Sequence, residues 1–264
     1  LLTIFMITFS YSQFDWDPNG IPVRQGYHVE WFRGGDISSD GAMFIVWSDT
    51  RTSSRNIYMQ KVDADGNVLW TDGGILISGG EGRQEDPIII ADNDGGAYIS
   101  WRSYANDSLY GELYIQHVSS DGTLSWNEKL ISNSTYIRVN SQQNMCSDLQ
   151  GGTYVSWYED ASAGDGYYYI VHIDSQGNIV GPDPIIQTQE NYGNVSLESA
   201  GNGDAAIAWK QGQTDSEDVY SQRVGVSANS IVEKWNNGEP LLVCDALGKQ
   251  TSTKVTYYSD EYVI

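Results

Sequence analysis

The sequence predicts an all-β fold built from small repeated sheets, and three observations support this prediction. The first is composition: the chain contains 18 Tyr, 9 Trp and 28 Gly but only 6 Pro. Aromatic residues suit pleated, half-buried strands, and glycine suits tight turns. The second is a tryptophan that recurs at intervals of 54, 56 and 52 residues. The third is a glycine-containing turn that follows it in successive copies, as in a repeat protein.

Length and charge limit the classes of function. A chain of 264 residues with 40% hydrophobic content can bury a substantial core. Its 35 Asp and Glu outweigh 14 Lys and Arg, and the net charge of -21 repels phosphate backbones and anionic membranes. The charge therefore disfavours nucleic acid as a partner.

Residues 1–12 resemble the remnant of a signal peptide. The stretch from Leu1 to Phe9 is apolar but too short to span a bilayer, and small residues follow it. We expect cleavage before Gln13 and export to the cell surface or beyond, with a buried first strand as the alternative. No initiator Met or basic segment precedes this stretch, so we expect the sequence to begin inside its gene. No other segment resembles a transmembrane span.

The recurring tryptophan closes a short strand in each copy. The four runs are GAMFIVW, GGAYISW, GGTYVSW and GDAAIAW, and they end at Trp47, Trp101, Trp157 and Trp209. An apolar residue two positions earlier shares the tryptophan's face of the strand: Ile45, Ile99, Val155 and Ile207.

A second strand begins 11 to 13 residues after each tryptophan, at Tyr58, Tyr114, Tyr169 and Tyr220. One position of this strand holds a basic residue in every copy, but its identity changes: Lys61, His117, His172 and Arg223. Because a catalyst or metal ligand tolerates no such exchange, this pattern predicts an exposed strand position.

The next element is a turn, DADGNVLW in the first copy and SSDGTLSW in the second. Gly66, Gly122 and Gly177 stand where a hairpin needs positive φ. The turn ends at Trp70 and Trp126, the third copy lacks this tryptophan, and the divergent fourth copy ends at Trp235. We expect these tryptophans to dock one sheet on the next.

The same turn raises an alternative, a calcium site formed by Asp63, Asp65 and Asn67. Calcium would need several further oxygen ligands, and the second copy has Ser119 and Thr123 at the outer positions. Acidic residues also favour turns through local hydrogen bonds. We therefore expect a corner and no cofactor, with calcium as the alternative.

An apolar stretch before each tryptophan strand brings the unit to four strands. Such units fit the radial packing of a β-propeller, with repeats at about 30–85, 86–141, 142–195 and 196–250, then a partial fifth, within a domain of residues 13–264. Since rings commonly need about six to eight blades, we expect a missing C-terminal part of the same chain as a partner.

The two cysteines fall at different positions of the repeat. Cys146 takes the place of Ile90, and Cys244 takes the place of Ser78. Pairing is possible in principle in an oxidising compartment, but the repeat predicts two separate, mostly buried thiols.

The first copy resembles a repeat of secreted bacterial surface proteins, with the pattern WxDxR...DIYxQxxDxxGxxLW. The matching residues are Trp47, Asp49, Arg51, Tyr58, Gln60, Asp63, Gly66 and Trp70. The resemblance covers about residues 30–264 and implies a propeller that is often exported by a type IX-like route. Copies two to four lack the Asp and Arg that follow the first tryptophan.

The loops after the tryptophan strands hold the candidate site residues. Asp49, Arg51, Arg102, Tyr104 and Tyr158 could form a binding rim, because aromatic faces beside charged groups suit sugars, although the same mixture also suits plain loop solvation. Arg55 lies in the first of these loops. A glycosidase would need two carboxylates across the cleaved bond, and Glu159 and Asp160 are the candidates.

Two functions therefore remain. The first is an exported, non-catalytic propeller that binds extracellular glycan or protein at the cell surface. The alternative is a propeller hydrolase or lyase that acts on extracellular polysaccharide. A cluster of opposed carboxylates with perturbed pKa values in a pocket would favour the enzyme.

Overall fold

The computed structural model describes residues 22–23, 30–105, 108, 110–132, 137–138, 143–160, 166–188, 195–213, 216–245, 254–258 and 261–263. The expected signal peptide at residues 1–12 lies outside these ranges. Apart from a 3-10 helix at Asn236–Gly238, the described elements are strands. None of them forms a helix with the length and apolar character needed to cross a membrane.

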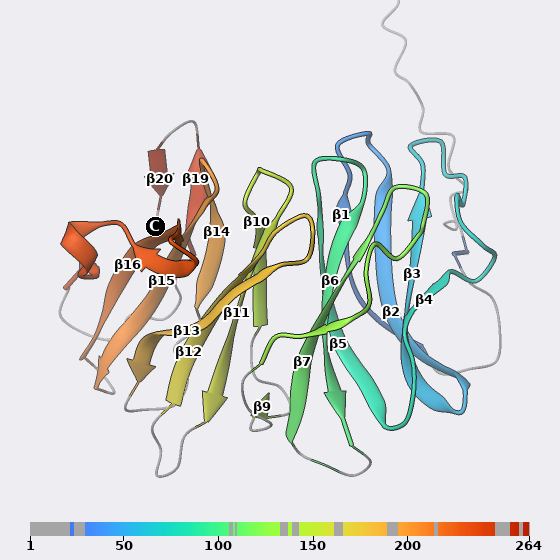
Figure 1. Ribbon diagram of the computed structural model, residues 1–264, viewed down its shortest axis with the longest axis horizontal. Helices are drawn as coiled ribbons and strands as arrows, with labels where there is room; N and C mark the ends of the chain where they lie inside the picture. The colour runs from blue at the N-terminus through green and yellow to red at the C-terminus, as the bar shows by residue number, and fades with distance from the viewer. Residues whose placement is uncertain are drawn as a thin grey trace, which may run out of the picture.

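The strands form a β-propeller of four-stranded antiparallel blades, as the sequence predicts (Figure 1). The first blade contains β1 (Glu30–Ile37), β2 (Met43–Thr52), β3 (Ser54–Val62) and β4 (Ile75–Ser78). The second contains β5 (Arg83–Ala91), β6 (Ala97–Tyr104), β7 (Tyr110–Val118) and β8 (Lys129–Leu130), with β9 (Ile137–Arg138) beside β7.

The third blade contains β10 (Gln143–Ser147), β11 (Thr153–Asp160), β12 (Gly166–Ile173) and β13 (Ile179–Thr188). The fourth contains β14 (Ser196–Gly201), β15 (Asp204–Gln213), β16 (Ser216–Ser227) and β17 (Ser230–Glu233), and β18 (Leu241–Cys244) also pairs with β16. A further pair, β19 (Thr256–Tyr258) and β20 (Glu261–Val263), stands beside β14.

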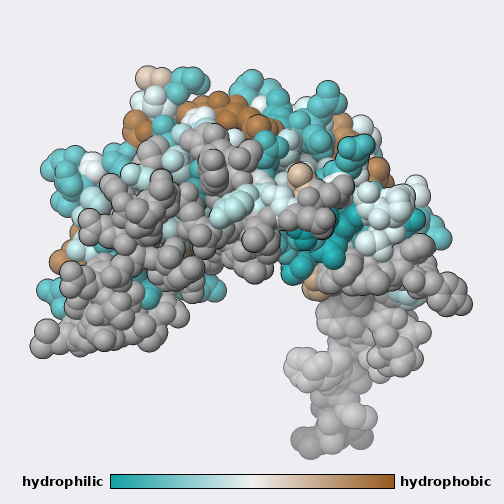
Figure 2. Space-filling model, turned by 90° about the horizontal axis from the view of Figure 1, so that it is seen from below, coloured by the Kyte–Doolittle hydropathy of each residue, from teal (hydrophilic) through white to brown (hydrophobic). Residues whose placement is uncertain are grey.

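The first strand of each blade lies nearest the propeller axis. β1 contacts β5, β5 contacts β10, β10 contacts β14, and β14 contacts β19. Seen along this axis, the blades form an arch whose concave side is the axial side (Figure 2). Loops at the inner strands therefore converge although they are far apart in sequence.

The recurring tryptophans occupy equivalent places at equivalent depth. Trp47, Trp101, Trp157 and Trp209 are at most 4% exposed. Each stacks on the tyrosine opposite it on the next strand, with ring centroids 5.9–6.3 Å apart and interplanar angles of 17–22°. This regularity confirms that the tryptophan interval marks one blade.

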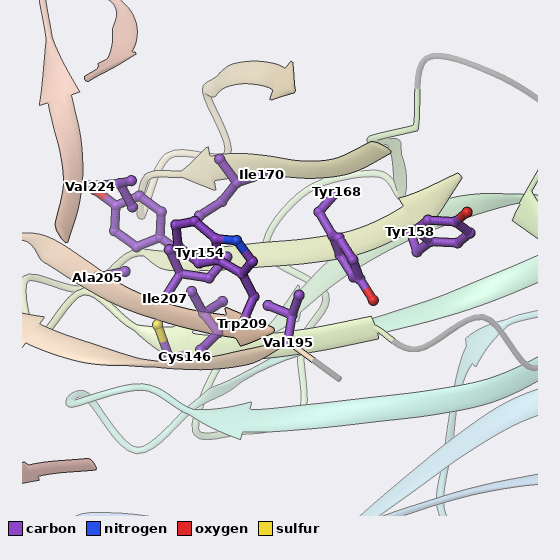
Figure 3. Close-up of a cluster of buried hydrophobic side chains, with 11 residues drawn as sticks. Cys146, Tyr154, Tyr158, Tyr168, Ile170, Val195, Ala205, Ile207, Trp209 and Val224 are labelled. Carbon is purple, nitrogen blue, oxygen red and sulfur yellow. The ribbon is translucent and has the colours of Figure 1, made fainter. Parts of the chain in front are cut away.

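The cores lie between adjacent blades. Trp209 and Ile207 of the fourth blade pack with Tyr154, Ile170 and Cys146 of the third (Figure 3). Trp157 packs in the same way on the second blade, and Trp101 on the first. Each sheet therefore covers the apolar face of its neighbour.

The turn tryptophans dock on the turn glycine of the next blade. A Cβ atom added to Gly122 would lie 3.1 Å from the Trp70 ring, and one added to Gly177 would lie 3.0 Å from the Trp126 ring. Both glycines have positive φ, +87° and +78°. Glycine is thus required twice at each place, for the turn and for the close approach.

A hydrogen bond to a glycine carbonyl also joins successive blades. The Tyr98 hydroxyl donates to the Gly151 carbonyl (2.7 Å), and the Tyr154 hydroxyl donates to the Gly203 carbonyl (2.8 Å). Lys61 Nζ donates to the Gly95 carbonyl (3.0 Å). The first blade has Phe44 in place of the tyrosine, and the Lys61 ammonium lies 5.1 Å from this ring. The lysine therefore supplies the bond that phenylalanine cannot make.

The prediction that the shared basic position is exposed is wrong. The Lys61 side chain is 3% exposed, and the His117 and His172 side chains are largely buried. The position faces an aspartate near the hairpin between the first two strands: Lys61–Asp40 (2.9 Å), His117–Asp92 (2.7 Å), His172–Asp148 (2.8 Å) and Arg223–Asp204 (2.7 Å). Sequence reasoning missed these pairs because the partner aspartate keeps its place in the hairpin only in the second and third copies.

Both cysteines are free; Cys146 is buried, as expected, whereas Cys244 is only half-buried. The strand register confirms their different positions. Cys146 lies opposite Tyr154 as Ile90 lies opposite Tyr98, while Cys244 lies opposite Val219 on an outer strand as Ser78 lies opposite Ile57.

Candidate functional site: an arginine cluster near the axis

The candidate carboxylates after the tryptophan strands accept hydrogen bonds from buried indoles. Trp47 Nε1 donates to Asp49 at 3.0 Å, and Trp157 Nε1 donates to Glu159 at 2.8 Å. The fourth blade uses the Gln211 amide at the same position, at 3.2 Å. A neutral amide can thus do the same task, which indicates a structural role for Glu159.

The second blade shows why this acceptor is needed. Ser103 stands two residues after Trp101 and is too short to reach the indole. Trp101 Nε1 instead donates to Gln84 of β5 at 3.0 Å. A buried N–H without an acceptor costs free energy of folding. Each blade therefore supplies an acceptor for its indole, although the residue that provides it differs.

Asp49 and Arg51 form one unit with Tyr58. The guanidinium of Arg51 donates to Asp49 through Nε (2.8 Å) and Nη2 (2.5 Å), and to the Gly73 carbonyl at 2.8 Å. It also lies 3.6 Å from the centroid of Tyr58. Burial opposes ionisation of Asp49, but the hydrogen bonds from Arg51 and Trp47 outweigh it and hold its pKa below the ordinary value. This unit ties β2 to the turn before β4.

The side chains of the candidate aromatic residues are buried in the fold and are not exposed at the rim. Tyr104 is 1% exposed and Tyr158 is 7% exposed. Tyr158 contacts Tyr168 at a centroid distance of 5.2 Å and covers Gly166. Burial raises the pKa of Tyr104. Asp160 ends β11, and its side chain lies outside the described part of the chain.

The turn carboxylate Asp63 is engaged by its own turn. It accepts hydrogen bonds from the backbone of Asp65 (3.0 Å) and Asn67 (2.7 Å), and from the Asn67 side chain (2.9 Å). Asp174 makes the same set in the third blade. Among the described residues, no three His, Cys, Asp or Glu gather in a group that could hold a metal ion.

A different group of charged residues gathers where β5 begins. We call it the arginine cluster, and its members come from four strands: Arg33 of β1, Arg55 of β3, Glu85, Asp86 and Arg83 of β5, and Arg102 of β6. It contains four of the eight arginines of the chain.

A distortion of β5 brings the two carboxylates of the cluster together. Asp86 has φ of +51°, although it is not glycine and precedes a proline, a combination that backbone sterics disfavour. The register with β6 shifts between Glu85 and Ile88, as at a β-bulge, which re-aims side chains. Arg102 lies opposite Glu85 in the register but bonds to Asp86 at 3.1 Å.

The ion pairs of the cluster form two adjoining groups. Arg33 and Arg102 hold the two oxygens of Asp86, at 3.0 and 3.1 Å. Arg55 and Arg83 both contact one oxygen of Glu85, the latter at 3.3 Å. Arg83 also donates to the Ser108 carbonyl at 2.9 Å and lies 5.1 Å from the Tyr104 ring.

The exposed side of the cluster is cationic. The Arg33 and Arg83 side chains are 39% and 36% exposed, while those of Asp86 and Glu85 are 21% and 7% exposed. Arg102 differs from these two arginines, because its side chain is 4% exposed and is more buried than that of Asp86. Figure 2 looks onto the face where β6 and β11 end, and it shows strongly hydrophilic side chains on the concave side of the arch, in the half that contains the first two blades.

Sequence reasoning identified Arg55 and Arg102 as rim residues but missed Arg33, Arg83, Glu85 and Asp86. These four precede the tryptophan strands, whereas the candidate loops follow them. The available signal was the stretch Arg83-Gln84-Glu85-Asp86-Pro87, since a proline within a strand marks an edge or a bulge.

A second concave feature lies away from the axis. A cavity of about 470 Å³ between β4 and the segment after β7 is lined by residues that include Leu76, Leu124, Trp126 and Glu128. The Trp126 ring packs on Gly177, and the Lys129 ammonium lies 5.3 Å from it. The indole is therefore already in use as a packing group.

A general acid needs a raised pKa. Burial and the nearby Glu239 raise the pKa of Glu233. Glu233 ends β17, an outer strand. Asp86 and Glu85 are instead held by guanidinium groups.

No protein-family model matches the chain, and no curated protein matches it. Similar solved structures include a thermostable family-43 glycoside hydrolase (13% identity, 80% of this chain and 76% of that chain covered, TM-score 0.43). Another is an α-L-arabinofuranosidase from Clostridium thermocellum (15% identity, 83% of this chain and 74% of that chain covered, TM-score 0.45). A third is a prolyl endopeptidase (12% identity, 83% of this chain and 29% of that chain covered, TM-score 0.46). At these values the similarity is one of strand arrangement only, and it assigns no activity to this chain.

Proposed function

We propose that this chain is a non-catalytic propeller that binds an extracellular glycan at the cell surface, through the face that carries the arginine cluster. The observation that carries the proposal is the cluster itself: the Arg33 and Arg83 side chains are 39% and 36% exposed at the axial side of a chain whose net charge is -21. Arginine offers several donors in a fixed geometry, which suits recognition of oxygen-rich ligands.

The use of carboxylates in the fold supports binding over catalysis. Asp49 and Glu159 accept hydrogen bonds from buried indoles, and Glu85 and Asp86 are paired with arginines. Export and membership of the secreted bacterial repeat proteins are part of the proposal. They are supported by the apolar segment at residues 1–12 and by the repeat pattern that begins at Trp47.

The test is to incubate the purified chain with polygalacturonate, alginate, dextran and starch, and to measure both retention and cleavage. We expect slower migration in gels that contain a bound polysaccharide, with no release of reducing ends or unsaturated products. Product formation that disappears in Glu159→Gln would establish the alternative, a polysaccharide hydrolase or lyase. If products form and persist after loss of both Glu159 and Asp160, these two residues are not the catalytic pair. Failure to bind any polysaccharide would refute the proposed function.

A further inference from the structure

We propose that the arginine cluster recognises a carboxylate on the glycan, so that the ligand contains a uronic acid residue that contacts Arg33 and Arg83. This inference rests on the proposed function, because it names the chemical group that the same face would bind.

The cluster already shows how its arginines hold a carboxylate. Arg33 Nη2 and Arg102 Nη1 hold the two oxygens of Asp86 at 3.0 and 3.1 Å. Planar guanidinium groups match carboxylates in this way, with shorter and stronger hydrogen bonds than neutral donors make. The ligand group that fits such a surface is therefore a second carboxylate.

The exposures fix where this second carboxylate binds. Arg102 is almost fully buried, while Arg33 and Arg83 each leave more than a third of the side chain accessible. Asp86 and Glu85 are less exposed than these two arginines. An anion that approaches from the axial side therefore meets Arg33 and Arg83 first.

The charge of the whole chain selects for a compact anionic group. A net charge of -21 opposes the approach of densely charged polymers such as nucleic acids. Charges farther away than about 10 Å are largely screened at 0.1 M salt, so the local cationic surface acts only at short range. A short uronic acid oligomer carries few charges, so it meets less repulsion from the chain than a nucleic acid does.

The strained backbone supports a dedicated site. Asp86 keeps φ of +51° before a proline, and such strained residues concentrate at functional sites. The distortion is what allows Asp86 to reach both Arg33 and Arg102. An undistorted strand would alternate its side chains and separate Glu85 from Asp86.

The test is isothermal titration calorimetry of the full chain with trigalacturonate, maltotriose, a hexaglutamate peptide and inorganic phosphate. We expect trigalacturonate to bind and maltotriose to bind at least tenfold more weakly. Arg33→Gln and Arg83→Gln should each weaken trigalacturonate binding about tenfold, because each removes a charge-assisted hydrogen bond. Arg33→Lys should fall between Arg33→Gln and the unmodified chain, since it keeps the charge but loses the planar fork.

Two further variants separate recognition from general charge and from folding. Asp86→Asn should weaken trigalacturonate binding, although it removes a negative charge, because the Asp86 carboxylate holds the Arg33 guanidinium in place at 3.0 Å and asparagine, which tolerates positive φ, keeps the backbone. Lys254→Gln is the matched control, because it removes one exposed positive charge from outside the cluster and should leave binding unchanged. Equal unfolding midpoints for Arg33→Gln and the unmodified chain would show that a loss of binding is not a loss of fold.

Several outcomes overturn the inference. They are tighter binding of hexaglutamate, equal binding of phosphate, or trigalacturonate binding that Arg33→Gln and Arg83→Gln leave intact. Binding of neutral but not acidic polysaccharides would overturn this inference and leave the proposed function standing. Absence of binding to every polysaccharide would overturn both.

Discussion

At the scale of single residues, Glu159 illustrates the difference between an acidic side chain and an acidic site. Its carboxylate accepts the indole N–H of Trp157 at 2.8 Å, and the residue is buried. Gln84 and Gln211 do the same for Trp101 and Trp209. The sequence alone also allows a catalytic role for Glu159. A position two residues after a tryptophan does not show that the indole N–H donates its hydrogen bond to this side chain.

We expect Glu159→Gln to be nearly neutral for stability and Glu159→Ala to be destabilising by about 1–3 kcal/mol. Glutamine keeps an acceptor for Trp157, whereas alanine leaves a buried N–H unpaired. Urea unfolding followed by tryptophan fluorescence measures both. Equal and large losses in the two variants would show that the negative charge of Glu159, and not its acceptor oxygen, is what the fold needs.

At the scale of elements, the strands and their order were predictable because the repeat encodes them directly. The tryptophan interval predicted the length of one blade. The register of β2 with β3 places Trp47 opposite Tyr58, as expected for paired strands. The bulge at Asp86 was not predictable in the same way. It interrupts the alternation of β5, and the candidate site depends on that interruption.

The docking of a turn tryptophan on a turn glycine gives a sharp test of how blades are joined. We expect Gly122→Ala to destabilise the fold by about 1–3 kcal/mol, because the methyl group would press on the Trp70 ring in addition to the cost of positive φ. Gly41→Ala is the matched control: its φ is +80°, and a Cβ there meets no atom within 4 Å.

The difference between Gly122→Ala and Gly41→Ala in chemical unfolding isolates the contact with Trp70. If both variants lose the same stability, the backbone conformation alone accounts for the glycine, and the tryptophan contributes nothing through this contact.

At the scale of the whole molecule, the pairing of an aspartate with a basic side chain recurs around the propeller with changed residues. Burial opposes ionisation of Asp92 and Asp148, but hydrogen bonds from His117, His172 and nearby backbone amides outweigh it and lower both pKa values. A lowered pKa means that the unfolded chain binds more protons than the folded chain as the pH falls. The stabilisation is therefore present above the ordinary aspartate pKa, near about 4, and is lost as the pH falls through the lower folded value.

We accordingly expect the melting temperature to fall between pH 5 and pH 3, and to fall less steeply in Asp92→Asn/Asp148→Asn. Asp94→Asn, at an exposed turn position, is the control and should keep the slope of the unmodified chain. Differential scanning calorimetry across this range measures the slope. A double variant as acid-sensitive as the unmodified chain would show that the two aspartates do not contribute to acid unfolding.

The overall architecture was predictable from the sequence, whereas the arginine cluster was predictable only in part. Net charge and repeat period can be read directly from the sequence. The cluster depends on Arg33, Arg83 and Asp86 meeting from β1 and β5, and only three-dimensional packing brings these residues together.

The most direct test of the account is a crystal structure of the chain with trigalacturonate. We expect an intact trisaccharide on the axial face, with one carboxylate about 2.7–3.2 Å from the guanidinium nitrogens of Arg33 and Arg83. A trisaccharide seated in the outer cavity beside Trp126, or one with a cleaved glycosidic bond, would contradict it.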